Sequence, residues 1–164
     1  MNKNKLTMNI FYLSEDPNEA AKYMYNKHVV KMILESAQLL CTAHIISDGE
    51  AANVPYKATH KNHPSAIWAR ESVSNYIWLY DHMLALGNEY TRRYGKKHLT
   101  ILKCSGILSN APANVTKTEF TPMPQCMPDQ YKVPGNSVEA YWNYYEAEKV
   151  SVKNANESII TRPK

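Results

Sequence analysis

A helical segment over residues 16–47, with nothing inside it that breaks a helix, constrains this chain more than any other feature. Asp16 suits the N-cap, Pro17 the first helical position and Glu19 the third, a pattern that opens helices. Asp48-Gly49 ends the segment. Its apolar residues recur at three- and four-residue spacing and form a stripe that must pack on other helices: Val30, Ile33, Leu34, Ala37, Leu40, Cys41 and His44. We therefore predict a mainly α fold.

Three further helices are predicted downstream. The second runs from Ser65 to about Tyr94, opened by Pro64 and closed by Gly95, and Gly87 is a place where it can bend or divide. A third is predicted over residues 97–108. A capping box over residues 136–139 opens the last, which ends near residue 150.

A long segment between the last two helices, residues 109–136, holds five prolines and little periodicity. This pattern predicts an ordered loop, and its stretch over residues 120–131 resembles a rigid lid. We predict one helical domain over residues 1–164, a compact bundle of about four helices with a Pro-rich loop. Residues 1–8 and 151–164 are predicted to be flexible.

Composition excludes several classes of protein. The chain has 164 residues, 44% hydrophobic and 21% charged, which fits one folded domain. Its three cysteines, far apart, form neither a disulfide framework nor a paired zinc motif, and no apolar run suggests a membrane span. We predict a cytoplasmic protein without a signal peptide, without metal or other cofactor, and with no membrane partner. A net charge of +4 favours polyanionic partners, either DNA or a nucleotide-like anion.

A narrow polar stripe on the first helix, between apolar walls, is the most informative chemical pattern. His28, Lys31 and Glu35 share this stripe, one helical turn apart, and Lys27 lies beside them. The stripe offers an amine nucleophile, a carboxylate base and a proton shuttle, so we predict catalytic roles for His28, Lys31 and Glu35 and substrate binding for Lys27. The alternative is an ordinary surface ion pair at i,i+4 with an exposed histidine.

A second polar cluster precedes the second predicted helix. His60, Lys61 and His63 are predicted to bind an anionic substrate at the start of that helix. Two other interpretations stay open: a metal site at the two histidines, for which no third ligand is evident, or His63 as a simple helix cap.

Two stretches of the second predicted helix complete the candidate set. Glu71 is predicted to be catalytic, and Arg70, Asn75 and Trp78 to contact a base or sugar. Arg93, in a basic segment that ends the helix, is predicted to contact substrate phosphate. The alternatives are core packing for the aromatic residues and stabilisation of the helix dipole for the basic ones.

The stretches over residues 23–35, 59–71, 125–132 and 137–149 resemble a group of small helical proteins of bacteriophages and bacteria. More distantly, the size, helical make-up, basic charge and closing Arg162-Pro163 are similar to the phage pyrimidine-dimer DNA glycosylases. That resemblance implies a compact α-helical enzyme that flips nucleotides and cleaves the glycosidic bond with an amine and a carboxylate. Phage origin would place it in the host cytoplasm.

The resemblance also implies particular site residues. The family uses the α-amino group of a Thr that follows the initiating Met, and a Glu that follows an Arg in the first helix. Here Asn follows both Met1 and Met8, and the matching helix stretch reads Asn26-Lys27-His28, so Glu35 supplies the carboxylate there and Lys27 or Lys31 would supply the amine.

We therefore predict a phage-type DNA-processing enzyme, a DNA glycosylase/lyase or another base-acting activity of the DNA-repair type. Two alternatives remain: an enzyme or binder of a small anionic nucleotide-like metabolite, and a non-enzymatic phage protein that binds a host factor. The prediction requires Lys31, Glu35, His60, His63, Arg70 and Glu71 to converge on one cleft.

Overall fold

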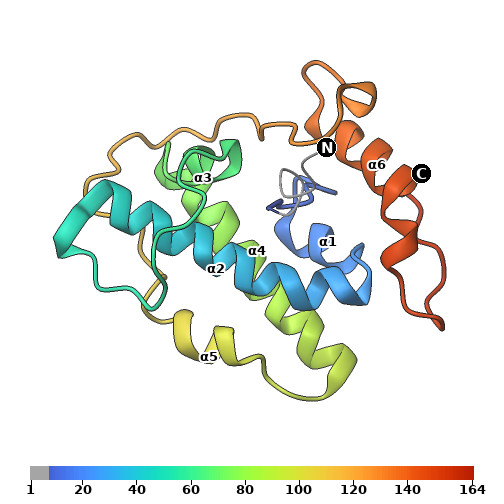
Figure 1. Cartoon of the computed structure of the whole chain (residues 1–164), viewed down its shortest axis with the longest axis horizontal. Helices are drawn as coiled ribbons and strands as arrows, with labels where there is room; N and C mark the ends of the chain where they lie inside the picture. The colour runs from blue at the N-terminus through green and yellow to red at the C-terminus, as the bar shows by residue number, and fades with distance from the viewer. Residues whose placement is uncertain (1–7) are drawn as a thin grey trace.

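The computed structural model describes residues 8–164, and these contain α-helices and no strand (Figure 1). The prediction of a mainly α fold is confirmed. The helices are α1 (Pro17–Lys22), α2 (Asn26–Asp48), α3 (Pro64–Ala69), α4 (Val73–Tyr94), α5 (Leu99–Cys104) and α6 (Ser137–Glu148). Short 3-10 turns follow at Gly49–Ala51, Asp129–Tyr131 and Val150–Val152.

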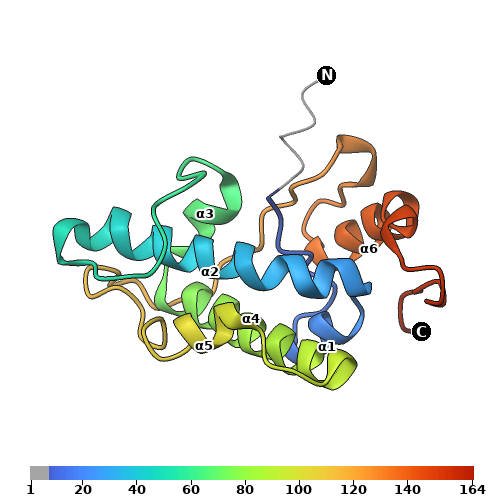
Figure 2. The ribbon, with the colours of Figure 1, turned by 60° about the horizontal axis from the view of Figure 1, so that its bottom comes forward.

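The two long helices, α2 and α4, cross in opposite directions at the centre of the molecule (Figures 1 and 2). Near one end of the crossing, His44 Nε2 lies 2.8 Å from the Tyr76 hydroxyl. At the other end, Arg93 donates to Asn26 Oδ1 at 2.9 Å. Helix α1 packs on α4, α3 on α2, and α5 on both long helices, so the buried core surrounds this crossing.

The prediction of one continuous helix over residues 16–47 is wrong, because the helix is interrupted at residues 23–25, between α1 and α2. Tyr25 takes an extended backbone with ψ of 155°, and its N–H donates to the Tyr145 hydroxyl at 2.9 Å. Both side chains are buried. The break is therefore stabilised by a partner from α6, which no local pattern could indicate.

The second predicted helix also breaks, between α3 and α4. The Ser72 hydroxyl caps α4 by accepting from Asn75 N–H at 3.1 Å, while Val73 N–H donates to the Lys117 carbonyl at 2.7 Å. In a continuous helix, Val73 N–H would bond a carbonyl of the preceding turn. Here the Pro-rich loop supplies its acceptor instead, so the break leaves no N–H of Val73 unpaired. The predicted stop at Gly95 is confirmed, with φ of 75°.

Helix α4 continues through Gly87 without dividing there. A Cβ at this position would lie 2.7 Å from Ile101 Cγ1, so the missing side chain lets α5 approach closely. Helix α5 is shorter than predicted, six residues in place of 97–108, and begins where His98 Nδ1 accepts from Thr100 N–H at 3.2 Å. The predicted cap of the last helix is confirmed: Asn136 Oδ1 accepts from Glu139 N–H at 3.1 Å.

The Pro-rich loop crosses the molecule from α5 to α6 and is anchored along the way (Figure 1). Trp68 Nε1 donates to the Thr121 carbonyl at 2.9 Å, and Thr121 N–H donates to Asn75 Oδ1 at 2.9 Å. Met123 and Met127 are buried. The loop is ordered as predicted, and its action as a lid stays a prediction.

Both ends of the described chain make specific contacts. The segment 8–13 is buried between α2 and α6, and Trp142 Nε1 donates to the Leu13 carbonyl at 2.8 Å. Arg162 pairs with Glu146 at 2.5 Å on α6. The predicted flexibility of residues 1–8 falls outside the described residues except at Met8, which is buried. The flexibility of 151–164 and the single-domain extent stay predictions.

The expectation that no segment of the chain suggests a membrane span is wrong for α2 by length and composition. The segment Asn26–Ala51 is long and apolar enough to span a membrane by length and composition alone. In the fold, 61% of its most apolar window is buried inside the protein, as expected for a core helix.

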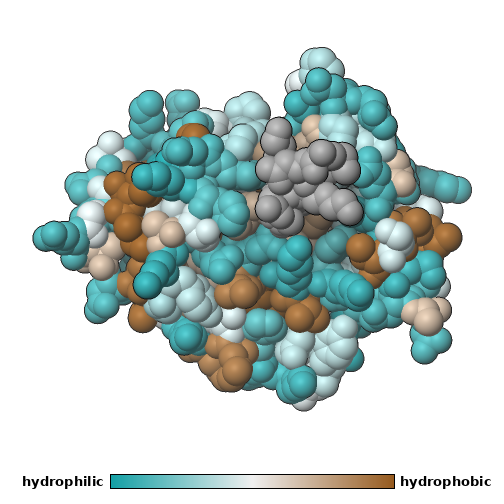
Figure 3. Space-filling view, viewed as in Figure 1, coloured by the Kyte–Doolittle hydropathy of each residue, from teal (hydrophilic) through white to brown (hydrophobic). Residues whose placement is uncertain are grey.

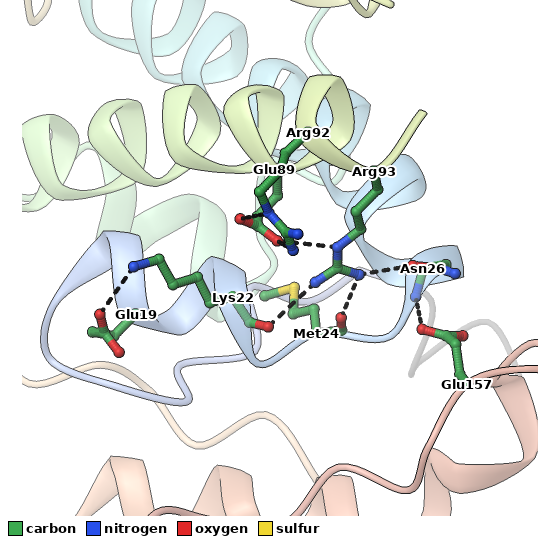
Figure 4. Close-up of polar contacts among 8 residues, drawn as sticks. All are labelled: Glu19, Lys22, Met24, Asn26, Glu89, Arg92, Arg93 and Glu157. Carbon is green, nitrogen blue, oxygen red and sulfur yellow. Dashed lines mark hydrogen bonds and ion pairs between the residues drawn. The ribbon is translucent and has the colours of Figure 1, made fainter. Parts of the chain in front are cut away.

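A buried carboxylate at the end of α4 fixes the junction between α1 and α2 (Figure 4). Glu89 accepts from Arg93 Nε at 3.0 Å and from Arg92 Nη2 at 2.7 Å. The Arg93 guanidinium then donates to the Met24 carbonyl at 2.8 Å and the Lys22 carbonyl at 3.2 Å. Burial raises the pKa of Glu89, but the bonds and charges of the two guanidinium groups outweigh it and hold that pKa below its usual value. Arg93 thus joins three parts of the fold.

We expect Arg93→Ala to lower the free energy of unfolding by roughly 2–3 kcal/mol, because it leaves part of a buried carboxylate and two helix-end carbonyls unpaired. Arg92→Ala is the matched control. Arg92 bonds the same carboxylate but its side chain is 67% exposed, so water can replace its hydrogen bond and the loss should be clearly smaller. Urea denaturation of both variants measures the difference, and equal losses would contradict the assignment.

Candidate active site

The candidate active site is a pocket of about 390 Å³ over the middle of α2. Most of its lining residues belong to α2; Met8 and His60 line it from two other segments, and His98 lines it from the N-cap of α5. The α2 residues that line it are Val30, Lys31, Leu34, Glu35 and Gln38. The structure therefore brings together Lys31, Glu35 and His60 from the predicted set.

Glu35 is the buried acid of this pocket, with 7% of its surface exposed. One carboxylate oxygen lies 3.5 Å from Lys31 Nζ, and the other accepts from the backbone N–H of Asn9 at 3.4 Å. Burial raises the pKa of Glu35, and the Lys31 charge and the Asn9 hydrogen bond oppose it without cancelling it. A carboxylate with a raised pKa beside an amine can accept a proton and later return it.

Asn9 is a site residue that the sequence analysis did not select. Its Oδ1 accepts from Ile10 N–H at 2.7 Å and Phe11 N–H at 3.2 Å, and its Nδ2 donates to the Cys126 carbonyl at 3.0 Å. Phe11 has a positive φ of 58°, an uncommon conformation for an aromatic residue. The side chain of Asn9 thereby fixes its own backbone nitrogen against Glu35.

His28 lies on α2 at the edge of this region, buried against Phe11 with a ring distance of 4.6 Å. The Tyr145 hydroxyl accepts from Tyr25 N–H at 2.9 Å and lies 2.7 Å from His28 Nδ1. Burial, followed by the charges of Lys149 and Lys31, lowers the pKa of His28 to about 3.

Lys149, after the end of α6, is a second residue that the sequence analysis missed. Its Nζ lies 4.7 Å from the centre of the Tyr144 ring and 5.8 Å from that of Phe11. Burial lowers the pKa of Lys149. It is more than 100 residues from the end of α2 in sequence, and no spacing rule links the two.

The second predicted cluster divides between two roles. His60 lines the pocket with a positive φ of 50°, and its Nδ1 lies 2.8 Å from the Thr59 hydroxyl. His63 Nδ1 instead accepts from Ser65 N–H at 3.0 Å, which caps α3. Lys61 is exposed, and its carbonyl accepts from Arg70 Nη2 at 2.8 Å. Among residues 8–164, no group of three His, Cys, Asp or Glu side chains could hold a metal ion.

The remaining predicted residues lie outside this pocket. Glu71 accepts from the Thr121 hydroxyl at 2.6 Å and lines separate hollows beside the Pro-rich loop. Asn75 and Trp78 are buried, and Trp78 Nε1 donates to the Glu15 carbonyl at 2.8 Å. Lys27 is exposed in the first turn of α2, and Arg93 is held at the α1–α2 junction. The six residues expected to meet in one cleft are not all lining the same pocket, and their roles stay predictions.

Fold and site together define an all-helical protein with a buried carboxylate between an amine and a backbone nitrogen. A family model described as pyrimidine dimer DNA glycosylase matches residues 8–102, more than half of the chain. The chain belongs to the pyrimidine dimer DNA glycosylase family, and the resemblance inferred from the sequence is confirmed. Searches of curated proteins and of solved structures returned no match.

The neutral state of His28 makes a prediction for acid stability. A folded-state pKa of about 3, lowered by burial from 6.5, means that the unfolded chain takes up a proton first as pH falls. The stability that neutral His28 contributes is thus present above pH 6.5 and lost progressively towards pH 3. His28→Asn keeps a hydrogen-bonding side chain opposite the Tyr145 hydroxyl and should flatten that loss, measured by urea denaturation at pH 8, 6 and 4. An unchanged slope would contradict the buried neutral ring.

Proposed function

We propose that this protein is a DNA glycosylase and that its reaction takes place at Glu35. The observation that carries the proposal is the buried carboxylate, with Lys31 Nζ at 3.5 Å and Asn9 N at 3.4 Å on its two sides. Family membership supports a base-excising reaction on DNA. The pocket of about 390 Å³ is large enough to take a nucleotide sugar or base.

The chemistry follows from an amine beside a carboxylate of raised pKa. Glu35 accepts the proton of the amine, whose lone pair attacks C1′ of the nucleotide. The bond from C1′ to the base breaks, and the base leaves with the electron pair and takes up a proton. The C1′–O4′ bond then breaks as the nitrogen forms a protonated imine with C1′, and O4′ takes up a proton that Glu35 relays from that nitrogen.

Two nitrogens flank Glu35, Lys31 Nζ and the backbone nitrogen of Asn9. Which of them could act as the nucleophilic amine depends on the residue at which the chain begins. In the chain as printed, Lys31 is the free amine, and its ion pair with Glu35 holds it in place. Asn9 follows Met8, so a chain that begins at Asn9 would carry its α-amino group at the position of the backbone nitrogen 3.4 Å from Glu35. That arrangement matches the α-amine chemistry implied by the resemblance. For the chain that begins at Met1, we propose that Lys31 is the nucleophilic amine.

Trapping with borohydride tests the proposal, because it reduces the imine to a stable protein–DNA adduct. Duplex DNA that contains a cyclobutane pyrimidine dimer should give the adduct, and Glu35→Gln should lower its rate of formation by about 10²–10⁴-fold. Glu71→Gln is the matched control and should keep most of the rate, since Glu71 lies beside the Pro-rich loop. Equal losses in both variants would contradict the site.

Mapping the adduct by peptide mass identifies the amine. The printed chain should carry the adduct on Lys31, and Lys31→Ala should abolish it. A chain that begins at Asn9 should move the adduct to its first residue. An adduct on neither position would contradict the proposed pair.

Salt dependence separates this function from the two alternatives. A duplex-binding enzyme should lose orders of magnitude in affinity between about 50 and 200 mM salt, whereas a site for a small nucleotide-like anion should change far less. A protein that binds a host factor should form no adduct with any duplex, and Glu35→Gln should leave its activity intact.

A further inference from the structure

Helix α5 presents two large apolar side chains to solvent. Leu99 is 79% exposed and Leu102 is 61% exposed, one helical turn apart on the same face. The opposite face is held by Ile101, which packs where α4 carries Gly87. Figure 3 shows hydrophobic atoms, in brown, where α5 lies in Figure 1, with hydrophilic atoms around them. Leucines this exposed on a short, well-anchored helix indicate contact with a partner.

These leucines lie at the rim of the candidate active site. His98 immediately precedes Leu99 and lines the pocket together with Leu34, which is itself 39% exposed. The same pocket holds Lys31 and Glu35. A partner that covers α5 therefore also reaches the carboxylate.

Charge around α5 determines what kind of partner fits. Residues 51–70 and 90–118 contain nine of the nineteen Lys and Arg and none of the fifteen Asp and Glu. The Tyr56 hydroxyl, 3.3 Å from Thr100 Oγ1, ties the first of these segments to α5. Five lysines are exposed in these two segments, within a few residues of the pocket or of α5: Lys57, Lys61, Lys96, Lys97 and Lys103.

A polyanion complements this surface, whereas a second copy of the chain would bring the same positive charge against it. Exposed leucines inside a basic rim match the way in which proteins insert apolar wedges between the bases of a bent duplex. The lysines would contact phosphates and the leucines the bases.

We propose that α5 is a DNA wedge: Leu99 and Leu102 insert between base pairs beside the nucleotide that enters the Glu35 pocket, and the five lysines hold the phosphates. The proposal rests on the proposed function for its partner, duplex DNA. It requires no covalent chemistry and can be measured without it.

Unstacking of bases tests the wedge directly. The probe is a short duplex with one cyclobutane thymine dimer and a 2-aminopurine beside it, whose fluorescence rises when it unstacks. The printed chain with Glu35→Gln should raise this fluorescence on binding. Adding Leu99→Ala and Leu102→Ala should remove at least about half of the rise at saturation and weaken binding about tenfold. Ile159→Ala, 64% exposed elsewhere, is the matched control and should change neither.

Two further measurements separate the possible outcomes. Lys96→Ala with Lys97→Ala should lower the slope of log affinity against log salt by about 2, with the rise at saturation unchanged. Unaltered unstacking in the leucine variant, or a dimer in sedimentation that the leucine changes dissociate, would overturn the wedge. If the unsubstituted protein forms the borohydride adduct but the leucine variant still unstacks the probe normally, the wedge is overturned and the glycosylase proposal stands. Leucine-dependent unstacking without any adduct supports the wedge and overturns the glycosylase.

Discussion

The ion pair between Glu89 and Arg93 is the interaction on which the rest of the structure depends. It lets one guanidinium bond the carbonyls of Lys22 and Met24, so the chain turns between α1 and α2 when it could have continued as one helix. That turn sets the direction of α2 across α4 and leaves room for the segment 8–13 beside it. Asn9 lies in that segment with its N–H against Glu35, which is buried.

Neighbouring polar residues of the site, one turn apart on α2, differ in burial and in pKa. Glu35 is buried and its pKa is raised, whereas Lys31, one turn away, is exposed and can reach both the acid and an incoming ligand. His28, a further turn away, has a lowered pKa, and its Nδ1 lies against the Tyr145 hydroxyl. Burial from α6 and the segment 8–13 creates these differences, because the three side chains alone form an ordinary polar stripe.

The sequence predicted what depends on neighbours along the chain. The caps at Asp16 and Asn136, the stop at Gly95 and the Lys31–Glu35 pair all involve residues within a few positions of each other. What it missed depends on distant partners: the helix breaks bonded by Tyr145 and Lys117, and the placement of Asn9 and Lys149 around α2. Glu71 and Glu35 look equally suitable in sequence, and only the fold puts one in the pocket and the other beside the loop.

The pH dependence of base release in a single turnover tests the central claim most directly, because it reports the ionisation of the group that takes the proton from the amine. The rate on a dimer-containing duplex should rise with pH through a pKa above that of an ordinary Glu, since burial raises the pKa of Glu35. That limb should disappear in Glu35→Gln, along with most of the rate. A limb of the same position and height in Glu35→Gln would contradict the assignment of Glu35 as the catalytic carboxylate.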